Sequence, residues 1–336
     1  MMKRLLYLPL LVGLLFSSCG GQPSGGNGDS NASDSPVEAV ETGVAGDDGL
    51  VDIPVNQRPD VAYIVEGELF LLNAVTLEKQ PVEAEKEAVF SCVFSPDDGM
   101  LYYTVVRGAK LAALKRAKFE DGKCTGLEEL CSLDIPLEEC ISIDQMAAPF
   151  FSEGVVIIPY EPYTDDLGFM SCAVYNPESG VATQKAELNE LELKDDSLSP
   201  SCHIVPEEGE DGEEACSGLS VSKDKDLLYK GKVIARASDF ADAPDRYMEA
   251  RPSKDGKLVV CGSGYYDPYG GPMLVAKTDG SGCYIFKHAR TGFDPYPRFL
   301  GDSHSLILNN GGLKIYSCRD FSERVVEENV DFWCAR

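Results

Sequence analysis

One short unit recurs along this chain: a strand-forming stretch ends in a serine-containing turn, often with Asp-Gly, and an apolar strand follows. The two clearest copies read VFSPDDGMLYYT over residues 93–104 and RPSKDGKLVVC over residues 251–261. Weaker copies lie at 150–160, 219–229 and 298–308. Asp-Gly favours a tight turn because glycine accepts a positive φ without steric cost. The unit therefore predicts many short antiparallel strands joined by turns.

The rest of the chain from residue 61 onward has the same character. Short apolar runs such as VAYIV, LYYTVV, KLVVC and LKIY alternate with Gly, Pro, Asp and Asn. Their length and their β-branched and aromatic members are typical of an all-β fold. One segment, AKLAALKRAKFED at 109–121, has the composition of a helix. We expect pairing with neighbouring strands to override that propensity.

The fullest copy runs from residue 251 to 297 and contains four strand segments in succession. This order resembles the TolB-like propeller repeat, in which each unit is one four-stranded blade. The resemblance covers about residues 60–336 and is weakest between 178 and 222. It implies a six-bladed β-propeller, with seven blades as the alternative. The anchor positions of the repeat have a mean spacing near 50 residues, which suits such blades; they are Ser95, Ser152, Ser222, Ser253 and Leu300.

The two ends of this region complement each other. Residues 61–83 contain three strand segments of a blade without its first strand, and NVDFWCAR at 329–336 has the pattern of that missing strand. We therefore predict that Val330–Ala335 pairs beside Val61–Val65 and closes the ring, which protects exposed strand edges. The alternative is a frayed tail, against which Phe332 and Trp333 argue.

The first 18 residues have the pattern of a signal peptide. Lys3 and Arg4 precede the apolar run Leu5–Phe16, which is too short to span a bilayer comfortably. The stretch ending in Cys19 resembles a bacterial lipobox, although Phe16 stands where leucine is usual. That resemblance implies lipidation of Cys19, and Gly20 in place of aspartate implies sorting to the outer membrane. The alternative is an ordinary signal peptide followed by an incidental cysteine.

Residues 19–56 are predicted to form a lipidated flexible tether, and residues 57–336 the propeller. The tether is rich in Gly, Ser, Asn, Asp and Pro and has no apolar periodicity. The chain carries a net charge of -26, which argues against nucleic acid as a partner. It also argues against electrostatic docking on anionic lipid. Attachment to a membrane of the bacterial cell envelope would therefore depend on Cys19.

Eleven further cysteines follow Cys19, and export would permit disulfides among them. The best local candidates are Cys202 with Cys216, across an acidic loop, and Cys124 with Cys131. The alternative for cysteines in or beside strands is that they are small buried residues; these are Cys92, Cys261 and Cys318. No C-x-x-C spacing occurs, so we predict no zinc site.

The chain carries no recognisable catalytic motif. It has three histidines outside any known pattern, and it lacks a nucleophile elbow, a zincin helix and a phosphate loop. We therefore predict no catalytic residues, no cofactor and no metal site. Three acidic pairs could ligate calcium, but none has EF-hand spacing, and we interpret them as turn or surface charge; they are Asp97–Asp98, Asp165–Asp166 and Asp195–Asp196.

Two aromatic segments are the candidate binding loops. GSGYYDPYGGP at 262–272 and PYEPYTDDLGF at 159–169 place tyrosines among glycines and prolines. Mobile aromatic loops at a blade rim could hold a peptide or a sugar; the candidate residues are Tyr160, Tyr163, Tyr265, Tyr266 and Tyr269. The alternative is that these rings only cover a blade edge.

Together these patterns predict a lipid-anchored envelope propeller that binds a protein, peptide or glycan without catalysis. Two alternatives remain open. One is a calcium-dependent propeller hydrolase or lactonase, and the other is a purely structural envelope lipoprotein.

Overall fold

The computed structural model describes residues 60–336, except residues 75, 97–98, 121–122, 142–145, 163–168, 189–201, 205–217, 240–245, 265–270, 292–296, 301–303 and 310–311. By its internal contacts the chain divides into two units, 1–41 and 42–336, and all described residues belong to the second. They form antiparallel strands and two 3-10 turns, without an α-helix in the described part. No helix among them could therefore cross a bilayer. The predicted all-β class is confirmed.

The described strands form six antiparallel sheets, which we name after one strand of each. The β1 sheet has the order β24 (Phe332–Ala335), β1 (Val61–Val65), β2 (Glu68–Leu72), β3 (Lys79–Pro81). The β4 sheet contains β4 (Ala88–Phe94), β5 (Leu101–Arg107), β6 (Lys110–Glu120) and β7 (Lys123–Pro136). The β8 sheet contains β8 (Phe150–Ser152), β9 (Val155–Pro162), β10 (Phe169–Asn176) and β11 (Val181–Glu187).

The remaining three sheets come from the second half of the chain. The β13 sheet contains β13 (Leu219–Val221), β14 (Leu227–Tyr229) and β15 (Lys232–Ala235). The β16 sheet has the order β12 (Cys202–Ile204), β16 (Arg246–Pro252), β17 (Leu258–Gly264), β18 (Gly271–Lys277), β19 (Cys283–Thr291). The β20 sheet contains β20 (Arg298–Phe299), β21 (Ser305–Asn309), β22 (Leu313–Ser317) and β23 (Glu323–Glu327). The 3-10 turns are η1 (Leu137–Cys140) and η3 (Ala237–Asp239).

The segment with helical composition is a strand, as predicted. β6 lies between β5 and β7 and pairs with both. Leu111, Leu114 and Ala117 are fully buried in it, so two neighbouring strands and two neighbouring sheets decide its conformation. Local helix propensity is a weak effect beside that packing.

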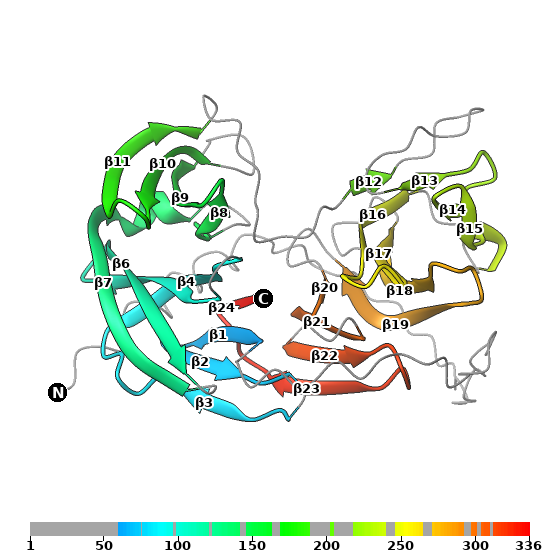
Figure 1. The fold of residues 1–336 in the computed structure, drawn as a ribbon, viewed down its shortest axis with the longest axis horizontal. Helices are drawn as coiled ribbons and strands as arrows, with labels where there is room; N and C mark the ends of the chain where they lie inside the picture. Colours follow the sequence, from blue (N-terminus) through cyan, green and yellow to red (C-terminus); the bar gives the residue numbers. More distant parts are fainter. Residues whose placement is uncertain are drawn as a thin grey trace, which may run out of the picture. The chain divides into compact units, whose positions relative to one another are not determined.

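The predicted pairing of the chain's last strand with its first is also confirmed. β24 pairs antiparallel with β1, with Trp333 opposite Tyr63 and Ala335 opposite Val61. Figure 1 shows the C-terminus beside β1. The backbone N–H of Arg336 donates to the carbonyl of Asp60 at 2.9 Å, which extends the ladder beyond the strand. The end of the chain is therefore part of the β1 sheet.

The repeated serine unit is the turn between two strands of one sheet. The N–H of the anchor residue donates to a carbonyl five residues later: Ser95 to Met100, and Ser253 to Leu258, each at 2.8 Å. The buried Ser253 hydroxyl donates to Asp255 at 2.6 Å and accepts from the Leu258 N–H at 3.0 Å. The recurrence of serine in this unit is thus explained by the hydrogen bonds of a buried turn, and not by a role of these serines in binding at the surface.

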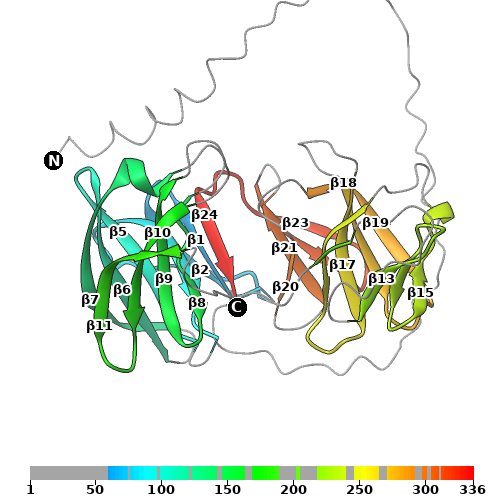
Figure 2. The same ribbon diagram turned by 90° about the horizontal axis from the view of Figure 1, so that it is seen from above.

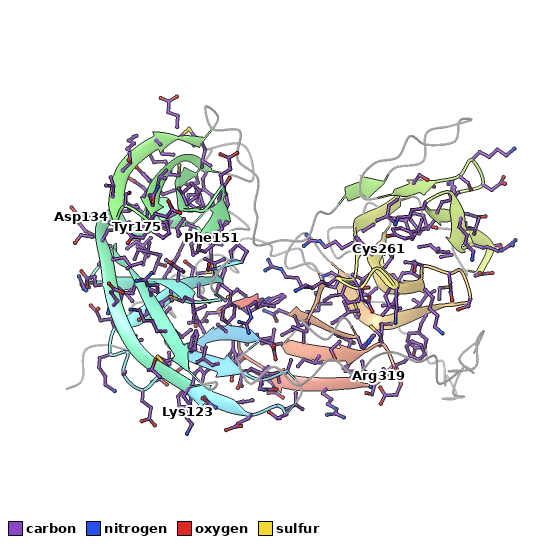
Figure 3. The ribbon with its side chains drawn as sticks, viewed as in Figure 1. Lys123, Asp134, Phe151, Tyr175, Cys261 and Arg319 are labelled. Carbon is purple, nitrogen blue, oxygen red and sulfur yellow. The ribbon has the colours of Figure 1, made fainter. Side chains whose placement is uncertain are left out.

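Apolar clusters hold neighbouring sheets face to face and link them in the order β8, β4, β1, β20, β16, β13. Between the β4 and β8 sheets, Tyr102 meets Phe151 edge to face with ring centroids 5.1 Å apart. Between the β16 and β20 sheets, Phe286 meets Tyr316 in the same manner at 5.1 Å. Figure 2 shows the strands of these sheets in a view turned by 90°, and Figure 3 labels Phe151 and Cys261, which belong to two of the clusters.

Candidate functional site

The first strands of the sheets are more buried than the last ones. β4 has six buried residues out of seven and β24 has three out of four. At the opposite edges, β23 has one buried residue out of five and β3 has none. Figure 1 shows β24, β4 and β20 lying toward one another, with β3, β7 and β23 farther out. We call β24, β4, β8, β16 and β20 the inner strands.

Two arginines occupy equivalent positions on neighbouring inner strands. Arg251 lies two residues before the anchor Ser253, and Arg298 lies two residues before the anchor Leu300. Their registers match, because Arg251 faces Val260 on β17 and Arg298 faces Ile307 on β21. Side chains alternate along a strand, so each arginine shares a face with its anchor. The turn geometry of the repeat therefore places both arginines at the same register position.

Arg298 contacts an aromatic residue on the next inner strand, β24. The Arg298 guanidinium carbon lies 5.3 Å from the ring centroid of Trp333 on β24. Trp333 is only 6% exposed and packs in the cluster between the β1 and β20 sheets. A cation over the face of an indole ring is attracted by the ring quadrupole. This contact fixes the planar head of Arg298 beside the terminal strand.

A third arginine continues the series on the other side of β24. Arg336 directly follows this strand, and its guanidinium carbon lies 5.9 Å from the ring centroid of Phe94 on β4. Arg251 and Arg298 lie on strands of the β16 and β20 sheets, and Arg336 directly follows a strand of the β1 sheet. These three sheets follow one another in the packing order. We call these three residues the arginine row.

The charge of the arginine row is opposite to that of the chain, which has 56 acidic and 30 basic residues. Arg251 is buried, and Arg298 and Arg336 are half-buried. Electrostatic attraction is stronger at such partly desolvated positions than in bulk water. A guanidinium group is always charged and presents a planar fork of donors that matches carboxylate and phosphate. The arginine row is therefore suited to binding an anion. It is not suited to acid–base catalysis, because a guanidinium group stays protonated.

Beside the arginine row lies a pair of thiols. Cys92 on β4 and Cys334 on β24 have their sulfur atoms 3.4 Å apart. Burial raises the pKa of the Cys92 thiol well above its usual range, and the contact with Cys334 acts in the same direction. The nearby positive charge of Arg298 opposes this effect. Cys92 is therefore held as the neutral thiol in contact with Cys334.

Most of the predicted loop residues and the lipidation site lie outside the described residues; these are Cys19, Tyr163, Tyr265, Tyr266 and Tyr269. Tyr160 is an exception. It belongs to β9, is 5% exposed, and packs in the cluster between the β4 and β8 sheets. Burial raises the pKa of its hydroxyl. Tyr160 is therefore a core residue, not part of an exposed binding loop.

The predicted bridge between Cys124 and Cys131 is wrong. Both cysteines lie on the single extended strand β7 and are free thiols. Seven residues of strand span roughly 23 Å, whereas bridged Cα atoms lie within about 7 Å of each other. The alternative pair, Cys202 with Cys216, stays a prediction, because Cys216 lies outside the described residues.

His304 and the acidic residues are further candidate sources of polar side chains for a site. The position of His304 in its repeat copy predicts a solvated turn residue, but the structure corrects this, because His304 is buried with 4% exposure. Its carbonyl accepts from the Cys318 N–H at 2.7 Å. Among the described residues no group of three or more His, Cys, Asp or Glu side chains could hold a metal ion. The three acidic pairs fall outside those residues.

The arginine row was not among the residues predicted from the sequence, although part of its signal is visible there. Arginine stands two residues before the anchor in two repeat copies, in the tripeptides RPS and RFL. Comparing that position across the copies would have identified Arg251 and Arg298. Arg336 carries no such signal, because its contact with Phe94 exists only once β24 has joined the β1 sheet.

No known protein family and no curated protein matches this chain. Solved structures that resemble it include TolB from Acinetobacter baumannii, with 12% identity and a TM-score of 0.42 over 83% of this chain and 67% of that one. A candidate 6-phosphogluconolactonase from Bacteroides fragilis NCTC 9343 has 11% identity and a TM-score of 0.39, over 84% and 99%. Another from Bacteroides uniformis ATCC 8492 has 12% identity and a TM-score of 0.39, over 83% and 99%. The resemblance to the TolB-like propeller inferred from the repeat is found again among solved structures.

Proposed function

We propose that this chain is a lipid-anchored β-propeller of the bacterial cell envelope that works by binding. Its ligand is an anionic group carried by an envelope protein, peptide or glycan. The observation that supports this role is the arginine row, in which three arginines lie on or directly after consecutive inner strands of a strongly acidic chain. Anchoring through a lipidated Cys19, in the outer membrane, is part of the proposal.

The proposed architecture is a closed ring of six blades, with β24 supplying the first strand of the β1 sheet. Five face-to-face clusters link the six sheets in a row among the described residues. Closure needs one more interface, between the β8 and β13 sheets. The chain between these sheets runs through 189–201 and 205–217, which lie outside the described residues.

The chemistry of the row favours binding of carboxylates. A guanidinium group can donate two parallel hydrogen bonds to one carboxylate, and such charge-assisted bonds are stronger than neutral ones. Arg298 is held against Trp333, so it loses little conformational freedom when a ligand arrives. The acidic outer surface would repel anions from other positions, which adds specificity.

Binding of a defined anionic probe tests the proposal. We would measure the affinity of the full chain, purified in detergent, for oligoglutamate, with oligoglutamine as the neutral comparison. The expected result is binding of oligoglutamate alone, with affinity that falls as salt is added. Arg298→Ala should weaken it by about 10-fold or more, because a charge-assisted hydrogen bond contributes roughly 1.5–3 kcal/mol.

The matched control is Arg319→Ala, which removes the same charge from an exposed position after β22, labelled in Figure 3. Its affinity should equal that of the unmodified chain. Equal binding of the two peptides, or equal losses in the two variants, would contradict a role for the arginine row. Capture of envelope components by the wild type and not by Arg298→Ala would then identify the natural ligand.

A further inference from the structure

We propose that Cys92 and Cys334 form a disulfide that fastens the last strand of the chain to the neighbouring sheet. Their sulfur atoms lie 3.4 Å apart, about 1.4 Å beyond the bonding distance of roughly 2.05 Å. Cys92 is 1% exposed and Cys334 is 4% exposed. The two residues are 242 positions apart in the chain, so only the folded structure brings them together.

The two thiols belong to different sheets that already pack against each other. Cys92 lies in the middle of β4 and Cys334 near the end of β24. Both are part of the apolar cluster between the β1 and β4 sheets, together with Ala62, Ile64 and Leu101. A bond between them would therefore cross the interface between two sheets, rather than join strands of one sheet. The backbones of β24 and β4 are fixed by their pairing with β1 and β5. Rotation of the two cysteine side chains therefore has to bring the sulfur atoms to bonding distance.

The position of β24 explains how the bond would stabilise the fold. β24 is four residues long, ends one residue before the C-terminus, and is the edge strand of its sheet. It is held by its hydrogen bonds to β1 and by apolar packing. A short edge strand is held by few contacts and opens easily. A covalent link to β4 would hold β24 in place even when its hydrogen bonds open transiently.

Formation of the bond is a thiol–disulfide exchange with an external oxidant, a small-molecule or protein disulfide. The thiolate of one cysteine attacks the oxidant and releases one thiol, which leaves a mixed disulfide. The thiolate of the second cysteine then displaces the other half. Two electrons pass to the oxidant, and its two released thiols carry the two protons. Because both cysteines are buried in the folded chain, exchange takes place during folding, and the finished bond is shielded from reductants.

This inference rests on the proposed export of the chain, since disulfides persist in oxidising compartments. It is independent of the arginine row and its ligand. Refolding in vitro with oxidised glutathione tests the disulfide separately from export and from ligand binding, because the oxidant is supplied and no ligand is present. A failure to form the bond in vitro would refute this inference alone.

Peptide mapping of the full chain is the direct test. The chain is unfolded, refolded with oxidised glutathione, alkylated and digested with trypsin. Cys92 lies in the peptide 87–107 and Cys334 in the peptide 325–336, each with a single cysteine. The expected product is the two peptides joined, with two hydrogens fewer than their sum. Recovery of both peptides separately alkylated would overturn the proposal.

Thermal unfolding with and without reductant tests the consequence. Wild-type chain that is refolded in reductant should have an unfolding midpoint about 5 to 10 °C lower than the oxidised wild type, whereas Cys334→Ala should unfold at the same midpoint after either treatment. Cys261→Ala is the matched control, because Cys261 is fully buried in a different cluster. This variant should keep the sensitivity to reductant. An equal effect of reductant on the unfolding midpoints of all three proteins would overturn the proposal. The peptide map uses the wild type alone, so it stays decisive even if a variant does not fold.

Discussion

Trp333 offers the sharpest test of how the terminal strand contributes to stability. It is the only tryptophan of the chain, it is 6% exposed, and it packs between the β1 and β20 sheets. Replacing it by alanine would remove on the order of 200 Å² of buried apolar surface, which corresponds to about 5 kcal/mol at ~25 cal/mol per Å². Measured losses for such substitutions are about 3–5 kcal/mol.

The loss of the contact with Arg298 adds about 1 kcal/mol to this value. We therefore expect Trp333→Ala to lower the free energy of unfolding by about 4 kcal/mol or more, and the thermal midpoint by on the order of 10 °C. Trp333→Phe should cost far less. It keeps a ring in the cluster and removes an indole N–H that has no hydrogen-bond partner among the described residues.

Far-UV circular dichroism during urea unfolding would measure these differences. Val325→Ala is the control, because this β23 side chain is 56% exposed and its loss should change stability by less than about 0.5 kcal/mol. In the wild type, Trp333 fluorescence and circular dichroism should report the same transition. A fluorescence transition at clearly lower urea, or a Trp333→Ala variant as stable as Val325→Ala, would refute an integral role for β24.

Three further predictions follow from other parts of the chain. Gly280→Ala should destabilise the fold by about 2 kcal/mol, because Gly280 has a φ of +69° and an added Cβ would lie 2.7 Å from the Val233 carbonyl oxygen; an unchanged thermal midpoint would contradict it. A hydrogen bond from Arg107 lowers the pKa of Glu87 to about 2, against the effect of burial. The resulting stabilisation is complete above pH ~5 and lost as the pH falls toward 2, so unfolding measured across this range should be less pH-dependent in Glu87→Gln. Cys19→Ala should leave the membrane fraction and lose incorporation of a fatty-acid label; continued membrane association of this variant would count against the anchor.

Several parts of the fold could be predicted because they depend on local pattern. Short apolar runs between turn residues indicate strands wherever they occur, and the repeated serine turn indicates which strands are consecutive in a sheet. The pairing of β24 with β1 was also predictable, since the first sheet lacked one strand and the C-terminus had the matching pattern. β6 could be assigned against its helical composition because both its neighbours in the chain are strands.

The cysteines illustrate where such reasoning fails. Nearness in sequence suggested Cys124 with Cys131, but one straight strand holds them far apart. Cys92 and Cys334 could not be paired from the sequence, because 242 residues separate them and their contact crosses two sheets. Likewise, Tyr160 was expected in a loop, yet β9 extends far enough to bury it.

The sequence by itself determined the strands, the turns between them and the strand that completes the β1 sheet, because each depends on residues close together or on a simple count of blade strands. Only the tertiary structure decided which side chains meet across sheets: Arg298 with Trp333, Arg336 with Phe94, and Cys92 with Cys334. The physical reason is that period-two alternation specifies the face of a strand on which a side chain lies. What that face meets is decided by the order and packing of whole sheets.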